Sequence, residues 1–121
     1  MPSQSEHLEK AEGNTRFANA IRPQTPVSSG WILTVLFYSA LHYVEAFNAK
    51  HNQHFHEHPS LSQDIHRNPQ LSAIYEDYRE LSDFSWNARY RPNNYGITEV
   101  TEAKESHAAV EQHIRGLLGI T

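Results

Sequence analysis

Residues 31–47 are the one long stretch of this chain that is apolar on almost every face. Thirteen of the seventeen residues are apolar or aromatic. The exceptions gather toward one side of a helix with about 3.6 residues per turn; they are Thr34, Ser39, His42 and Glu45. The stretch falls short of the ~20 apolar residues that cross a bilayer, and two ionisable side chains would be costly there. It therefore predicts a buried core helix whose polar side is the place to look for chemistry.

The composition bounds the class of protein. A chain of 121 residues can bury a core as one compact domain, so we expect a single domain over residues 1–121. The chain has no cysteine, which excludes a disulfide framework and a thiolate metal site. Its first residues lack the basic and apolar segments of a signal peptide. We therefore expect a cytoplasmic protein with no membrane partner.

The formal charge of −4, with histidine counted as neutral, argues against binding duplex nucleic acid mainly by neutralising its phosphates. A local basic patch remains compatible with this charge. The nine histidines are the anomaly in the composition. Because imidazole titrates near pH 6.5, binding by this chain is expected to depend on pH.

The segments before the core stretch show a helix and a connector. Residues 5–21 have the apolar spacing of an amphipathic helix, with acids in its first turns. The connector that follows contains Pro23 and Pro26, where a helix is not expected to continue. Ser28 or Ser29 is then the expected cap of the core helix.

Beyond residue 47 the apolar pattern gives way to a polar connector, with a short helix expected at 60–67. Apolar and small positions then recur at three- and four-residue steps and predict a long helix over roughly 69–90. Thr98, followed by acids, is the expected start of the last helix. With short connectors, these patterns predict an all-α antiparallel bundle of four to five helices in which the others cover the core helix.

The predicted helix over 69–90 carries both small and bulky residues in its second half. Ser82, Ser85 and Ala88 are small, which lets this half approach a neighbouring helix closely. Phe84 and Trp86 lie off the apolar stripe. Together with Trp31 they predict a homodimer face, because aromatic side chains outside the core are typical of interfaces. The alternative is that Trp86 packs under residues 52–59.

A histidine-rich segment follows the core helix. Its imidazoles suit zinc, copper or nickel; they belong to His51, His54, His56 and His58. The spacing is only loosely that of a metal site, and no residues that would orient the ligands are recognisable. A native metal site and a solvated loop are the two interpretations.

A second group of polar residues lies along the core helix. Tyr38, His42 and Glu45 form a line that is expected to face Arg79 or Arg89 of the next long helix. A histidine and a glutamate three residues apart can share a proton, and an arginine can bind phosphate through two hydrogen bonds. These are the parts of a nucleotide-binding or phosphodiester-cleaving site. The alternative is that the side chains only pair with each other and fix the helix register.

Three stretches show a resemblance to the HEPN family of small helical proteins. In residues 37–46 an aromatic pair, small residues and a histidine precede an alanine-rich turn. Residues 58–67 combine histidine, charge and a short turn, and residues 81–90 close the third long helix with an arginine before a tyrosine. In order and spacing these stretches are similar to the family pattern, and the likeness covers about residues 5–118.

The resemblance implies a four- or five-helix bundle, often dimeric, in a family of RNA-cleaving toxins, defence-system ribonucleases and partners of small nucleotidyltransferases. Catalytic members carry an arginine and, four to six residues later, a histidine near the end of the third long helix. In this chain no arginine has a histidine at that spacing, and Arg89 and Arg91 lead into residues 92–96 without one. Because the mechanism uses the histidine as acid or base, the departure argues against the usual activity.

We therefore predict an accessory or binding protein for RNA, a nucleotide or a nucleotidyltransferase partner, which needs no cofactor. The expected ligand-binding residues are Tyr38, His42, Glu45, Arg79, Arg89 and Tyr90. One alternative is a HEPN-type ribonuclease or toxin whose rearranged catalytic site uses His42 and Arg89 at a dimer groove. The other is a metal-binding protein that uses residues 51–58. His107, alone on the apolar stripe of the last helix, is interpreted as a satisfied core or edge histidine.

Overall fold

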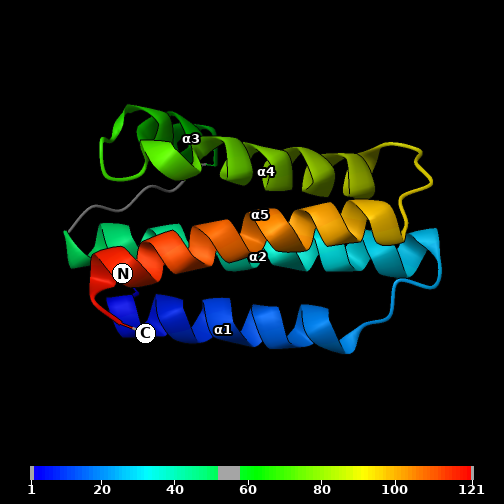
Figure 1. The fold of residues 1–121 in the computed structure, drawn as a ribbon, viewed down its shortest axis with the longest axis horizontal. Helices are drawn as coiled ribbons and strands as arrows, with labels where there is room; N and C mark the ends of the chain where they lie inside the picture. The colour runs from blue at the N-terminus through cyan, green and yellow to red at the C-terminus, as the bar shows by residue number, and fades with distance from the viewer. Residues whose placement is uncertain (1, 52–57, 121) are drawn as a thin grey trace.

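The computed structural model describes residues 2–51 and 58–120, with side chains at 2–51 and 61–120 (Figure 1). Every regular element in these residues is helical, so the prediction of an all-α fold is confirmed for them. The elements are α1 (Gln4–Ala20), α2 (Pro26–Lys50), α3 (His58–Arg67), the 3₁₀ turn η1 (Ser72–Ile74), α4 (Tyr75–Tyr90) and α5 (Ile97–Leu118).

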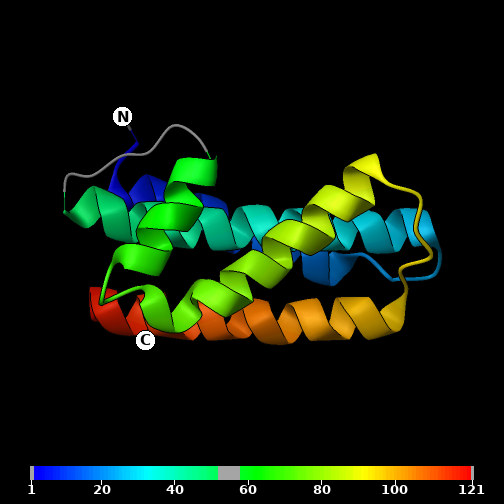
Figure 2. The same ribbon diagram turned by 90° about the horizontal axis from the view of Figure 1, so that it is seen from above.

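α2 is the central element and contacts α1, α4 and α5. In Figure 1, α1 lies on one side of α2 and α4 on the other, and Figure 2 shows α5 running beside α2 while α4 crosses obliquely over them. The prediction that residues 31–47 form a buried core helix is confirmed, except that Trp31 is exposed. The fully buried apolar residues of α2 include Ile32, Leu33, Leu36, Phe37, Ala40, Tyr43, Val44, Ala46 and Phe47.

α2 begins earlier than the sequence pattern indicates. Thr25 is the N-cap, and its hydroxyl accepts a hydrogen bond from the backbone N–H of Ser28 at 3.1 Å. The Ser28 hydroxyl accepts in return from the backbone N–H of Thr25 at 3.0 Å. Pro26 occupies the first turn, where the missing N–H has no helical partner to lose. The expectation that Ser28 or Ser29 caps the helix is therefore wrong.

The long helix expected over 69–90 begins only at Tyr75. The side chain of Asn68 accepts a hydrogen bond from the backbone N–H of Gln70 at 2.8 Å, which closes a turn around Pro69. The 3₁₀ turn η1 then leads into α4. In contrast, α5 begins one residue before the expected Thr98. The Glu99 carboxylate accepts a hydrogen bond from the backbone N–H of Gly96 at 2.8 Å and caps the helix there.

By length and composition, α2 is also apolar enough to cross a membrane, and it is the one helix among the described residues for which this holds. Most of its apolar stretch is buried inside the protein, as in the core helix of a folded domain.

α5 ends at a glycine that the backbone conformation requires. Gly119 has a φ of 72°, in the left-handed region that side chains with a Cβ rarely adopt. Its N–H and that of Ile120 donate back to the carbonyls of Gly116 and Arg115 at 3.2 and 2.9 Å. These bonds satisfy the last carbonyls of the helix.

We expect Gly119→Ala to lower the free energy of unfolding by about 1 kcal/mol, because alanine is strained at this φ. Gly116→Ala is the matched control three residues earlier, inside α5, where a Cβ meets nothing within 4 Å. It should raise the stability by about 0.5–1 kcal/mol through helix propensity. Urea denaturation measures both; shifts of the same sign would contradict the assigned helix end.

Candidate functional site

A groove of 480 Å³ lies between the first turns of α2 and the C-terminal end of α4. A Cβ on Gly30 would lie 3.6 Å from the Cβ of Ala88, so the two helices approach closely here. The close approach expected from the small residues of the 69–90 pattern is thus confirmed at Ala88. The groove is lined by Pro26, Val27, Gly30, Trp31, Thr34, Ala88, Arg89, Arg91, Pro92 and Asn93.

Arg89 is held in a fixed position at this groove. Its Nη1 donates a hydrogen bond to the Tyr38 hydroxyl at 3.0 Å, and its Nε donates to the carbonyl of Ser85 at 3.2 Å. Its guanidinium carbon lies 5.6 Å from the ring centre of Tyr38 and 5.1 Å from that of Tyr90. The structure therefore brings together three of the six predicted ligand-binding residues, from α2 and α4.

Large aromatic side chains are exposed around the same end of the molecule. Trp31, Trp86 and Tyr90 are 59%, 53% and 62% exposed. The rings of Trp86 and Tyr90 lie 4.6 Å apart at an angle of 51°. The alternative to a homodimer face was that Trp86 packs under residues 52–59. Most of that segment lies outside the described residues, so this alternative stays a prediction. The exposure of Trp86 leaves it open to a ligand or partner.

Phe84 is less exposed than Trp31, Trp86 and Tyr90, and its place on a homodimer face stays a prediction. It is half-buried and packs edge to face against Tyr95, with ring centres 5.5 Å apart at 89°. Both residues line a second groove, of 470 Å³, on another face of α4. Arg79 also lies there, among Glu76, Asp77, Glu80 and Asp83, and not in the groove that holds Arg89.

The predicted polar line on α2 separates into different environments. Tyr38 faces α4 through Arg89, whereas the Nδ1 of His42 lies 3.1 Å from the Nδ1 of His7 on α1. The pKa of His42 is lowered to about 4, first by burial and then by the charges of His7 and Lys10. Within the described residues, no hydrogen bond or ion pair joins His42 to Arg89.

Glu45 is 7% exposed and makes no hydrogen bond within the described part of the chain. Burial raises the pKa of its carboxyl to about 7. Burial raises the pKa of Tyr78, and the negative charge of the nearby Glu45 carboxylate raises it further. Tyr78 Oη and Asn48 Nδ2 are also buried, and neither atom has a hydrogen-bond partner among the described residues. Glu45 therefore sits in the interior and not at the groove.

The histidine-rich segment is described only at its start. His51 is exposed at the end of α2, with its ring centre 4.6 Å from that of Phe47. His54 and His56, and the side chain of His58, lie outside the described residues. In the part of the chain that is described, no group of three or more histidine, aspartate or glutamate side chains is placed to hold a metal ion.

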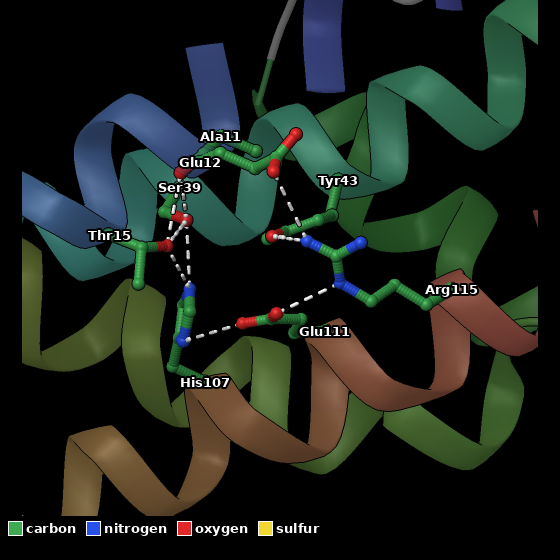
Figure 3. A network of polar contacts seen from close by, with 8 residues as sticks. All are labelled: Ala11, Glu12, Thr15, Ser39, Tyr43, His107, Glu111 and Arg115. Carbon is green, nitrogen blue, oxygen red and sulfur yellow. Dashed lines mark hydrogen bonds and ion pairs between the residues drawn. The ribbon is translucent and has the colours of Figure 1, made fainter. Parts of the chain in front are cut away.

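A buried polar network joins α1, α2 and α5 around His107 (Figure 3). His107 Nε2 lies 2.8 Å from the Ser39 hydroxyl and 3.3 Å from the Thr15 hydroxyl. Its Nδ1 lies 4.0 Å from Glu111, and burial lowers the pKa of the ring. The interpretation of His107 as a satisfied core histidine is confirmed. Its partners were missed, because hydroxyls at small positions give no distinct sequence signal.

This network has the residue types of a serine–histidine–carboxylate triad, but its geometry is structural. The Ser39 hydroxyl donates to the carbonyl of Ala11 at 2.8 Å, so its proton points away from His107. Ser39 is also completely buried, which leaves no room for a substrate. A nucleophile needs its proton directed at the base and an open approach to the reacting atom.

His42 and Glu45 give opposite dependences of stability on pH. The folded pKa of Glu45 is raised from 4.5 to about 7, so its contribution to stability falls as pH rises through that window. The folded pKa of His42 is lowered from 6.5 to about 4, so its contribution is full above pH 6.5 and falls with acidification. The two slopes oppose each other between about pH 4.5 and 6.5.

We expect Glu45→Gln to raise stability near pH 7.5 by about 2–3 kcal/mol and to expose a loss of stability on acidification. His42→Gln should remove the loss of stability on acidification that His42 causes, so the stability of this variant should fall less between pH 7 and pH 5 than that of the wild type. Urea denaturation at several pH values measures these slopes. Parallel profiles for wild type and Glu45→Gln would show that Glu45 titrates normally in the folded protein.

The chain matches no protein-family model, and searches of curated proteins and of solved structures give no match either. The assignment of a function therefore rests on the residues and geometry described above.

Proposed function

We propose that this protein binds single-stranded RNA or a nucleotide in the groove between α2 and α4, as an accessory protein and not as a nuclease. The observation that carries the proposal is the combination of the exposed indole of Trp31 with Arg89 and Arg91 around one groove. Single-stranded nucleic acids are bound by aromatic rings that stack on bases, next to cationic groups that contact phosphates.

The groove has a suitable size and chemistry. Its volume of 480 Å³ lies within the range of small-ligand sites. Arg89 uses two of its N–H groups on Tyr38 and Ser85, which fix the guanidinium and leave its other N–H groups for a ligand. The side chain of Arg91 makes no hydrogen bond or ion pair within the described residues and is exposed. Two guanidinium groups can therefore meet one phosphodiester segment.

The charge around the groove differs from that of the whole chain. The described residues that line the groove include two arginines and no carboxylate, although the chain carries a formal charge of −4. The acids gather elsewhere, with four of them in the groove that contains Arg79. A polyanion is therefore favoured at the first groove and repelled from the second.

Binding is better supported than cleavage. The candidate base His42 is directed at His7 on α1, whereas the candidate phosphate ligand Arg89 is directed at Tyr38 and Tyr90 on the α4 side. General acid–base catalysis requires both groups at the same phosphodiester. The five helices and the resemblance in three stretches support the proposal that the chain is a HEPN-like antiparallel bundle. A nucleotidyltransferase partner is a further prediction from the same resemblance.

We expect Trp31→Ala to weaken the binding of a fluorescein-labelled single-stranded RNA by about 1–3 kcal/mol, through the loss of one stacking surface. Arg91→Gln should weaken binding and lower its dependence on salt, because one phosphate contact is lost. Fluorescence anisotropy at two salt concentrations measures both effects.

Arg79→Gln is the matched control for these variants, because it removes the same charge from the acidic groove. It should leave the affinity unchanged or slightly lower. Gel analysis of the same mixtures tests for cleavage. Equal affinities for wild type, Trp31→Ala and Arg91→Gln would refute the groove as the binding site, and RNA cleavage that depends on His42 and Arg89 would support the nuclease instead.

A homodimer is the second candidate property, and the exposed stack of Trp86 on Tyr90 favours it. Two such stacks that face each other would bury aromatic surface that is now in contact with water. We expect light scattering at tens of micromolar to give the mass of a dimer, and Trp86→Arg to give that of a monomer. A monomeric wild type would refute this proposal and leave RNA binding untouched.

A further inference from the structure

His7 and His42 meet where the N-terminal half of α1 packs on α2. Their Nδ1 atoms lie 3.1 Å apart, with ring centres 5.3 Å apart and ring planes at 33°. His7 is buried, and His42 is only half-buried, so solvent reaches the pair from the side of His42. The backbone positions are fixed, because α1 contacts α2 along its length and inserts the fully buried Ala11 and Ala18 into the core.

The separation of the two nitrogens suits a shared metal ion. Imidazole nitrogens bind zinc at about 2.0–2.1 Å. Two nitrogens 3.1 Å apart at that distance enclose an angle of about 98° at the ion. This angle lies between the values for square-planar and tetrahedral coordination, so two neighbouring ligand positions are spanned. The hydrogen bond directs the two nitrogens toward each other, so each ring must turn by about 40° to direct its lone pair at the ion.

The protonation state of the pair also suits a metal. A metal ligand must be a neutral imidazole, and a hydrogen bond between two Nδ1 atoms 3.1 Å apart requires one of the two rings to accept through an unprotonated nitrogen. In the absence of metal, one ring donates its Nδ1 proton to the other. When an ion binds, that ring carries its proton on Nε2 instead, so no net proton is released at neutral pH.

We propose that His7 and His42 chelate one divalent transition-metal ion, with Cu²⁺ the most strongly bound, and that water completes its coordination. Imidazole ligands favour copper, nickel and zinc, and copper binds most tightly in that series. In the described part of the chain no third histidine or carboxylate joins the two rings. This site is separate from the groove between α2 and α4 and does not depend on the proposed binding of RNA.

Nearby charges set the affinity of this site. The ammonium group of Lys10 is close enough to lower the pKa of His42, and it opposes a bound cation in the same way. Glu6 lies one residue from His7, and the two interact electrostatically. We expect Lys10→Gln to bind the metal more tightly than wild type. A bound ion links α1 to α2 and should raise the melting temperature.

The experiment must separate this site from the histidine-rich segment. The four histidines of residues 51–58 are therefore replaced by asparagine in the full chain, as His51→Asn, His54→Asn, His56→Asn and His58→Asn. This loop variant is titrated with Cu²⁺ at pH 7.5 by calorimetry. We expect one bound ion per chain, with hyperfine coupling to two imidazole nitrogens in the electron paramagnetic resonance spectrum.

Adding His7→Gln or His42→Gln to the loop variant should abolish this binding. His66→Gln is the matched control, because His66 is exposed on α3 with its ring against Tyr75 and should leave binding unchanged. Absence of stoichiometric binding in the loop variant would overturn the proposal, and so would binding that survives both substitutions.

A second measurement leaves His7 and His42 unchanged. It tests the proposal even if the protein with His7→Gln or His42→Gln does not fold. Substoichiometric Cu²⁺ is added to the folded loop variant, and the imidazole proton signals are followed by NMR. The signals of His7 and His42 should broaden first, while those of His66 on α3, a helix that does not contact α1 or α2 in the described part of the chain, should broaden least. Broadening at other histidines while those two remain sharp would show that the pair binds no metal.

Discussion

The burial of α2 on several sides is the constraint on which the rest of the structure depends. Between Ile32 and Asn48 most side chains of α2 are buried against α1, α4 and α5, so few polar side chains in this part of the helix are in contact with water. Each polar residue of α2 must therefore find a partner on a neighbouring helix or remain unpaired at a cost in free energy. Ser39 pairs toward α1 and α5, Tyr38 toward α4, and His42 toward α1.

These separate pairings explain why the polar line on α2 is not a single site. Tyr38, His42 and Glu45 follow one another at steps of four and three residues, so they share one side of the helix. Their partners nevertheless lie on different helices, with Arg89 on α4 and His7 on α1. Arg115 shows the same principle from the side of α5. It donates to the Tyr43 hydroxyl at 3.1 Å and to Glu111 at 2.9 Å, and lies 3.5 Å from Glu12. One guanidinium thus joins three helices beside the His107 network (Figure 3).

Much of the fold follows from apolar periodicity, but its boundaries and its site do not. The sequence indicates the core helix and the close approach near Ala88, because both depend on side-chain size and hydrophobicity alone. The start of α2 at Pro26 depends on whether Thr25 accepts a hydrogen bond, which is a local geometric detail. The groove depends on the angle at which α4 crosses α2, which no local pattern encodes. The sequence therefore predicts correctly that Arg89 faces Tyr38. It offers Arg79 as an equal alternative, whereas Arg79 lies in the other groove.

The arrangement of charge on α4 shows how an acidic protein can present a site for an anion. Arg79 and Arg89 are ten residues apart, and this spacing places them on different sides of a helix with about 3.6 residues per turn. Arg79 lies among four carboxylates, so its charge is largely offset where it stands. Arg89 lies against aromatic rings and a hydroxyl, none of which neutralises it, and Arg91 adds a second positive charge. The local field at the groove is therefore set by residues within about one Debye length, and the net charge of −4 acts there only weakly at physiological salt.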